Sequence, residues 1–180
     1  MTAPDERKAE GAGGLDRPSQ DPPDDRKAEG PGGPDRPARN SAPLHVIRLD
    51  RAFGPVVEGE AVVSEEGFSP RYDLDRWTGV ITKPGHRLEG TSIRERICFF
   101  PTAKGGIAAG WAFNDIKAKG ISPRAYVFGV LNPVMVQGAV LAGVPITEGW
   151  SEDPQKVLRT GDWVRVDPGR KVVELLRRAS

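Results

Sequence analysis

The chain has 180 residues, enough for one domain with an appendage. Its 26 basic and 25 acidic residues nearly balance, which excludes a strongly basic nucleic-acid binder and an acidic cation store. The longest apolar runs, such as 125–131, are too short to span a bilayer, and the first residues lack the apolar core of a signal peptide. We therefore expect a cytoplasmic protein that binds neither nucleic acid nor membrane.

The composition also limits the cofactors that this chain can hold. It contains one cysteine, Cys98, and two histidines, His45 and His86. A single cysteine forms no internal disulfide and cannot supply the three or four thiolates of an iron–sulfur cluster or a structural zinc site. We expect no metal on this chain, so that any such cofactor would belong to another chain.

Residues 1–43 differ in composition from the rest of the chain. They contain no Val, Ile, Phe, Tyr or Trp, and segment 5–18 recurs as 24–37 with 11 of 14 residues identical. Such a segment cannot bury enough apolar surface to offset the entropy lost on ordering. We predict a disordered, repetitive tail over 1–43, either a flexible spacer or a docking peptide for a partner, followed by a folded domain over 44–180.

The first half of the domain contains three predicted strands, 44–49, 56–63 and 94–100, where β-branched and aromatic residues lie between Gly and Pro. The last of them ends in four consecutive apolar residues, as in a strand buried on both faces. Cys98 lies in this run, so its thiol is expected to pack in the core rather than to react.

The second half alternates helices with strands. A helix is predicted over 107–119, with Ile107, Ala108, Trp111, Ala112 and Ile116 on its buried side. The remaining elements, in chain order, are a strand at 125–131, a helix at 133–142 capped by Asn132, a strand at 144–147, a short helix at 154–159 and a hairpin of 162–166 and 171–175.

The order strand–helix–strand–helix–strand in the middle of the domain implies parallel pairing, whereas its two ends suggest antiparallel pairing. We therefore expect an α/β fold with a mixed sheet or barrel and two main helices.

The loop between the buried strand and the first helix, 101–106, is the strongest candidate for chemistry. It reads Pro-Thr-Ala-Lys-Gly-Gly, which places Lys104 and two glycines at a helix N-terminus. Unpaired N–H groups and the helix dipole favour an anion there, and glycines let a ligand approach the backbone. The spacing is not that of a Walker A loop. The alternative is an ordinary turn between a strand and a helix.

Two further segments are weaker candidates. His86 lies in a turn-rich segment, where a surface histidine is expected more often than a catalytic base. Ser69, Tyr72 and Asp75 lie in an irregular stretch, 68–77, that is either a functional loop or a connection.

Taken together, these segments resemble the aconitase X swivel domain, the small subunit of two-part dehydratases. No single motif decides the resemblance, but the ordered set covers about residues 57–167. The matching residues are Gly59-Glu60-Ala61; Ser69, Asp75, Thr78, Gly79, Val80 and Ile81; His86, Leu88, Gly90 and Ser92; Phe100-Pro101; Lys104-Gly105; Pro133 and Gly138-Ala139-Val140; and Arg159-Thr160-Gly161-Asp162.

The resemblance implies a swivelling β/β/α fold and a large-subunit partner that carries an iron–sulfur cluster. It also implies dehydration of a small hydroxylated acid; family substrates include a phosphorylated mevalonate and cis-3-hydroxyproline. Ser69, Lys104, Gly105 and Gly106 would then bind the substrate, with no metal on this chain.

One departure from the family concerns catalysis. Gly106 stands where the family carries a serine thought to act as general base, and a glycine has no side-chain atom to accept a proton. Thr102, Tyr72 or a residue of the partner could replace that base. Three functions stay open: a dehydratase subunit inactive alone, a non-catalytic binding module with a degenerate site, and a related reaction of secondary metabolism on the same scaffold.

Overall fold

The computed structural model describes residues 42–180, so the predicted tail over 1–43 lies almost wholly outside the described residues, and its boundary stays a prediction. The strands are β1 (His45–Arg48), β2 (Arg51–Phe53), β3 (Val57–Val63), β4 (Leu74–Asp75), β5 (Val80–Ile81), β6 (Ile97–Thr102), β7 (Ala125–Val130), β8 (Ile146–Glu148), β9 (Trp163–Asp167) and β10 (Val172–Arg177). The helices are α1 (Ile107–Ala118), α2 (Pro133–Leu141) and α3 (Pro154–Val157).

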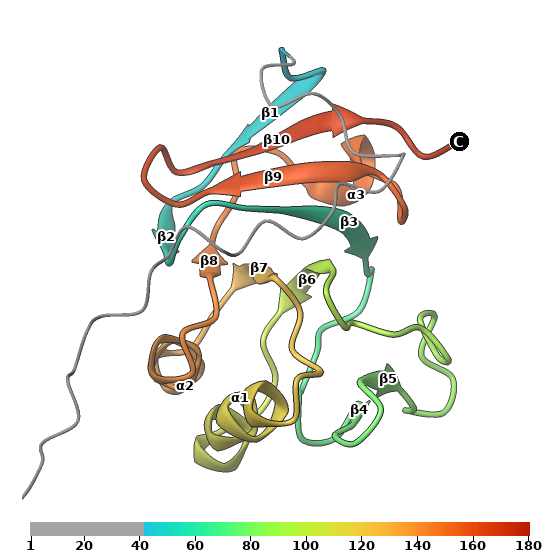
Figure 1. Ribbon diagram of the computed structural model, residues 1–180, viewed down its shortest axis with the longest axis vertical. Helices are drawn as coiled ribbons and strands as arrows, with labels where there is room; N and C mark the ends of the chain where they lie inside the picture. Colours follow the sequence, from blue (N-terminus) through green and yellow to red (C-terminus); the bar gives the residue numbers. More distant parts are fainter. Residues whose placement is uncertain (1–41) are drawn as a thin grey trace, which may run out of the picture. The chain divides into compact units, whose positions relative to one another are not determined.

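Eight of these strands form one mixed sheet in the order β1-β10-β9-β3-β6-β7-β8-β2 (Figure 1). Strands β3, β6, β7 and β8 are parallel neighbours, and the other pairs are antiparallel. The predicted parallel middle and antiparallel ends are therefore confirmed. The short pair of β4 and β5 lies apart from this sheet, and β4 falls in the stretch 68–77 that was predicted to be irregular.

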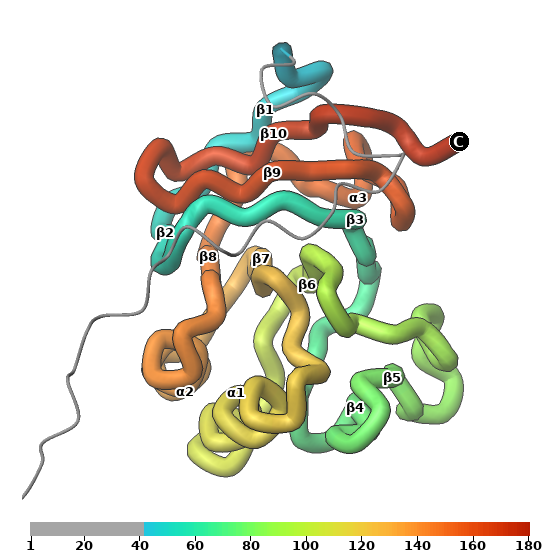
Figure 2. Tube along the Cα trace, viewed as in Figure 1, coloured from blue at the N-terminus to red at the C-terminus, as the bar shows by residue number. Residues whose placement is uncertain are grey.

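The two edges of the sheet are joined by a single corner of the chain. Strand β1 ends at Arg48 and β2 begins at Arg51, yet these two strands form opposite edges of the sheet (Figure 2). At the corner, the Leu49 N–H donates to the carbonyl of Lys171 (2.9 Å) and the Asp50 N–H donates to that of Glu148 (3.2 Å). The fold thus has features of both predicted alternatives, a mixed sheet and a barrel. The sheet is open, but its two edge strands follow each other directly in the chain and meet at one corner.

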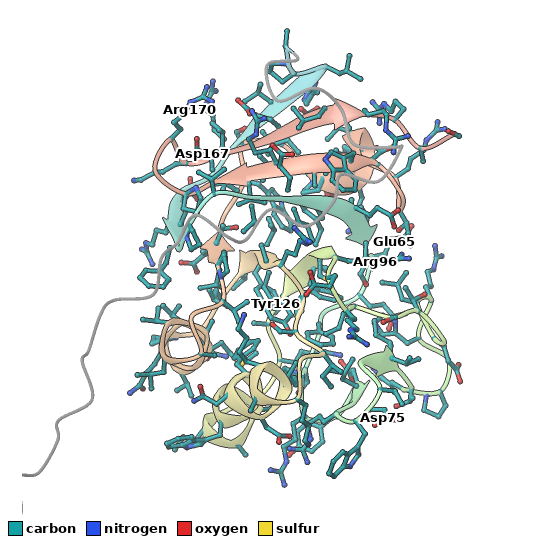
Figure 3. The ribbon with its side chains drawn as sticks, in the orientation of Figure 1. Glu65, Asp75, Arg96, Tyr126, Asp167 and Arg170 are labelled. Atoms are coloured by element: carbon teal, nitrogen blue, oxygen red, sulfur yellow. The ribbon has the colours of Figure 1, made fainter. Side chains whose placement is uncertain are left out.

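Alternation along β6 and β7 separates two apolar cores, because successive side chains of a strand point to opposite faces. Ile97 and Phe99 enter the core enclosed by the sheet. Cys98 and Phe100 enter the core between the sheet and the helices, which also holds Tyr126, seen in the interior in Figure 3. Cys98 is packed in this core, as predicted, and its burial raises the pKa of its thiol.

Helices α1 and α2 cover one face of the parallel strands and cross at a pair of glycines (Figure 1). A Cβ atom at Gly138 would collide with the Gly110 carbonyl, so the helices pack backbone to backbone. This close approach corrects the predicted face of α1. Ala112 and Ile116 are buried as predicted, but Ile107, Ala108 and Trp111 are exposed. The buried residues of α1 are Ala109, Gly110, Ala112, Phe113 and Ile116. The helix is apolar around most of its circumference, so its periodicity alone did not determine which side would be buried.

None of the helices within residues 42–180 has the length and apolarity needed to cross a membrane.

Candidate functional site

The predicted loop lies where the carboxyl ends of two parallel strands meet two helix N-termini. Strand β6 leads through the loop into α1, and β7 leads through Asn132 into α2. The Asn132 side chain caps α2 by accepting from the Met135 N–H (3.0 Å) and also donates to the Gly105 carbonyl (3.1 Å). Asn132 therefore holds the loop against α2, at the end of the strands where α/β sheets commonly bind ligands.

The N-terminus of α1 has no side-chain cap among the described residues. Its first intrahelical hydrogen bond is donated by Ala109 to the Gly106 carbonyl (2.9 Å), so the N–H groups of Ile107 and Ala108 precede the helical ladder. The first turn of this helix holds no acidic residue. The positive end of the helix dipole is thus not neutralised by the helix's own residues.

A second loop, 66–73, is held beside the first by backbone hydrogen bonds. Phe68 donates to the Thr102 carbonyl (2.9 Å) and accepts from the Lys104 N–H (2.8 Å), so the two loops run side by side. As a result the Ser69 hydroxyl lies 3.4 Å from the position that a Cβ atom would take at Gly105. The structure therefore brings together Ser69, Lys104 and Gly105, three residues predicted to bind substrate.

Asp73, which the sequence did not single out, links these residues. Its Oδ2 accepts from the Ser69 N–H (2.8 Å) and lies 3.0 Å from the Lys104 ammonium. Lys83 approaches the other carboxylate oxygen at 4.0 Å. The sequence offered no signal for Asp73, because two of its partners, Lys83 and Lys104, come from other segments that meet its loop only in the folded chain.

The Ser69 hydroxyl is buried without a hydrogen-bond partner. Ser69 is 2% exposed, and its Oγ meets no partner among the described residues. An unsatisfied buried polar group costs about 1–3 kcal/mol, so such a group is commonly matched by a ligand, a water or a partner chain. Its position beside Gly105 points to a ligand at the α1 N-terminus.

A turn at 83–88 forms a third side of the site and corrects the prediction of a surface histidine. His86 is 3% exposed, because the turn folds back onto the 66–73 loop. The Arg87 N–H donates to Glu66 Oε1 (3.1 Å), and this bond is the main reason that the pKa of Glu66 is lowered. The positive charges of Lys83 and Lys104 lower the pKa of Glu66 further, which places both ammonium groups near its carboxylate.

The two adjacent glycines of the loop differ. Gly105 has φ +117°, and a Cβ atom there would lie 2.6 Å from that of Ala109, so only glycine fits. Gly106 has φ −118° and ψ −145°, and an added Cβ would meet no atom within 4 Å. Contacts with neighbouring atoms therefore do not require a glycine at this position, and Gly106 leaves open space over the helix N-terminus.

The other sequence candidates lie at the margin of the site. The Thr102 side chain is exposed, and its carbonyl pairs with the 66–73 loop. The Tyr72 ring is 71% exposed and lies under the Arg71 guanidinium. Asp75 closes a local turn, accepting from the Trp77 N–H (2.8 Å) and the Thr78 hydroxyl (2.9 Å), which lower its pKa.

The described residues do not fit an iron–sulfur cluster. Such a cluster takes thiolate ligands, and the sole cysteine of the chain is buried in β6 with its thiol kept protonated. No group of three or more His, Cys, Asp or Glu side chains within residues 42–180 is placed to hold a metal ion.

Comparison with known proteins decides the family. The family model of the aconitase X swivel domain matches residues 46–175. The chain belongs to this family. Phosphomevalonate dehydratase small subunits are similar: that of Methanococcoides burtonii is 33% identical over 123 residues, 68% of this chain and 90% of the relative, and that of Pyrococcus furiosus 35% over 121 residues, 67% and 88%.

Solved structures agree with this membership. A crystal structure of Thermococcus kodakaraensis aconitase X in its holo form matches with a TM-score of 0.68 and 28% identity, covering 74% of this chain and 99% of the other. The resemblance and the swivel-type α/β fold are therefore confirmed. The relatives of this aconitase X swivel domain are subunits of a hydro-lyase, which associates the chain with dehydratases, whereas the roles of its individual site residues stay predictions.

Proposed function

We propose that this chain is the small subunit of an aconitase-X-type hydro-lyase, which removes water from a hydroxylated acid together with a large subunit. The observation that carries the proposal is the convergence of a buried, unpartnered Ser69 hydroxyl and the Lys104 ammonium on the uncapped N-terminus of α1. These groups are hydrogen-bond donors and positive charge, which suit a carboxylate or phosphate.

In this function Lys104 and the N–H groups of the Gly105–Gly106 segment hold the acidic group of the substrate. Asp73 takes one of the three ammonium donors of Lys104 and so orients the side chain, leaving two donors for the substrate. Ser69, whose N–H is bound by the same carboxylate, presents its hydroxyl beside Gly105.

The proton acceptor is proposed to be a partner residue. Gly106 offers no side-chain atom, and Tyr72 directs its ring mainly into solvent. The open space over Gly106 can admit a side chain of the large subunit or a bulkier substrate than the family serine allows. The iron–sulfur cluster implied by the family would likewise lie on the large subunit, because the described residues do not fit it.

The same open space supports a second candidate, a non-catalytic module that binds a small acid. The loss of the serine removes the group that the family resemblance assigns to catalysis, while the anion-binding features are retained. The two functions differ in one respect that can be measured, which is turnover by the chain with its partner.

The test is an assay of the chain co-expressed with a large subunit, using 5-phosphomevalonate as the first substrate. We expect turnover, and Lys104→Met should raise the substrate KM about 10–100-fold, since a charge-assisted hydrogen bond contributes about 1.5–3 kcal/mol. Lys117→Met is the matched control, because Lys117 is exposed at the far end of the same helix.

Binding without turnover would favour the non-catalytic module. An unchanged KM in the Lys104→Met protein would remove Lys104 from the site.

A further inference from the structure

The second buried polar group without a partner belongs to the turn at 83–88. We propose that His86 is a substrate-binding residue whose Nε2–H donates to an acidic oxygen of the ligand held at the α1 N-terminus. The inference rests on the proposed function, and it assigns a role to a histidine that the sequence alone placed on the surface.

The hydrogen bonding of the ring determines which nitrogen is available. The Leu88 N–H donates to His86 Nδ1 (3.0 Å), and because a backbone N–H only donates, Nδ1 is the acceptor. The neutral ring therefore carries its hydrogen on Nε2. This atom is buried and meets no partner among the described residues. His86 thus presents a donor, and it has no free lone pair with which to act as a base.

The position of His86 places this donor with the other groups of the site. His86 lies in a turn whose Arg87 N–H donates to Glu66. Glu66 is followed by Gly67, where an added Cβ atom would lie 3.4 Å from the Lys104 side chain. Lys83, which opens the same turn, reaches toward Asp73. Two separate contacts therefore fasten the turn to the loop that carries Ser69.

Few buried side-chain polar atoms of the described residues lack a hydrogen-bond partner, and not all of them mark a binding site. Six buried side-chain polar atoms in residues 42–180 lack a partner. Two of them, Ser69 Oγ and His86 Nε2, come from the loops joined through Asp73 and Glu66. The other four belong to residues outside these loops, namely Tyr126, Thr147, Trp163 and Arg177.

The charges of the site explain why neutral donors are needed. Lys83 and Lys104 are balanced by Asp73 and Glu66, so the cluster carries little net positive charge. Besides the two remaining donors of Lys104, an anionic ligand is then bound by neutral donors that are not already engaged, which are the first N–H groups of α1, the Ser69 hydroxyl and the His86 Nε2–H.

The first experiment compares variants in the complex with the large subunit, using 5-phosphomevalonate. His86→Phe should raise KM about 10–100-fold with a smaller effect on kcat, and His86→Gln, which keeps a donor, should restore part of the affinity. His45→Phe is the control, because His45 is the only other histidine of the chain. It lies on β1, where its Nε2 is 2.8 Å from the Glu152 carboxylate. A KM unchanged in His86→Phe but raised in Lys104→Met would overturn the role of His86 and leave the proposed function standing.

A second measurement on the unmodified protein covers the case in which His86→Phe does not fold. With ¹⁵N-labelled histidine, the His86 ring should show the Nε2–H tautomer, and its Nε2 resonance should shift when 5-phosphomevalonate is added, while that of His45 should not. Saturable binding without a shift at His86 would contradict the inference. Failure of the wild-type complex to bind or turn over the acid would count against the proposed function and this inference together.

Discussion

Gly105 and Gly106 show that neighbouring glycines serve different purposes. At Gly105 the positive φ and the contact with Ala109 exclude any side chain, so this glycine shapes the loop. At Gly106 φ is negative and the space is open. Steric contacts therefore require the glycine at 105 but not the one at 106.

This difference predicts opposite outcomes for two serine substitutions. Gly106→Ser should leave the melting temperature within a few degrees, whereas Gly105→Ser should lower stability by about 1–3 kcal/mol through strain and overpacking. Thermal unfolding of the two proteins measures both effects.

Activity of the Gly106→Ser protein with its partner then addresses catalysis. If the wild type is inactive, a gain in the variant would show that the loss of the serine disabled the site; general-base catalysis typically contributes about 10²–10⁴-fold. If the wild type is active, the variant should change the rate without being required. A Gly106→Ser protein that unfolds like Gly105→Ser would contradict the open space described here.

Helix α1 also presents an apolar surface beside the site. Its exposed Ile107 and Trp111, with Leu141 of α2, line a groove of about 400 Å³ that contains no charged residue. The groove begins at the residue that follows Gly106, so a chain that completes the site over Gly106 would lie against it. We expect the large subunit to occupy this groove, in keeping with the small-subunit relatives.

Trp111→Arg should therefore weaken assembly with the large subunit at least tenfold, because a buried aromatic anchor typically contributes 2 kcal/mol or more to an interface. Co-purification and titration of the two subunits measure this. Trp77→Arg is the control: Trp77 is 79% exposed and contacts the Lys119 ammonium outside the groove. Equal assembly by both variants would place the interface elsewhere.

For the molecule as a whole, a chain that begins at Pro43 should melt within a few degrees of the full-length protein. The apolar residues of both described cores lie between Ile47 and Leu175, so removal of 1–42 takes away none of them. Differential scanning calorimetry of the two chains tests this. A fall of ten degrees or more would show that the segment packs against the domain.

Local sequence patterns determined most of the secondary structure. The cap of Asn132 followed by Pro133, the apolar run ending at Phe100 and the turn after Asp167 mark elements by short-range chemistry, and the structure places elements there. The order of these elements also implied the parallel middle of the sheet. The loop with Lys104 was found because a strand, glycines and a helix start follow one another in the chain.

Other features were decided only by tertiary structure, because they depend on contacts between distant segments. The predicted strand 44–49 ends at the corner of Leu49 and Asp50, and the following strand β2, which was not predicted, joins the opposite edge of the sheet, where its partner comes from far along the chain. The buried side of α1 was chosen by the Gly110–Gly138 crossing, since its apolar pattern allowed more than one face. Asp73 and His86 joined the site because three loops meet there, and no local pattern records which side chains such loops bring together.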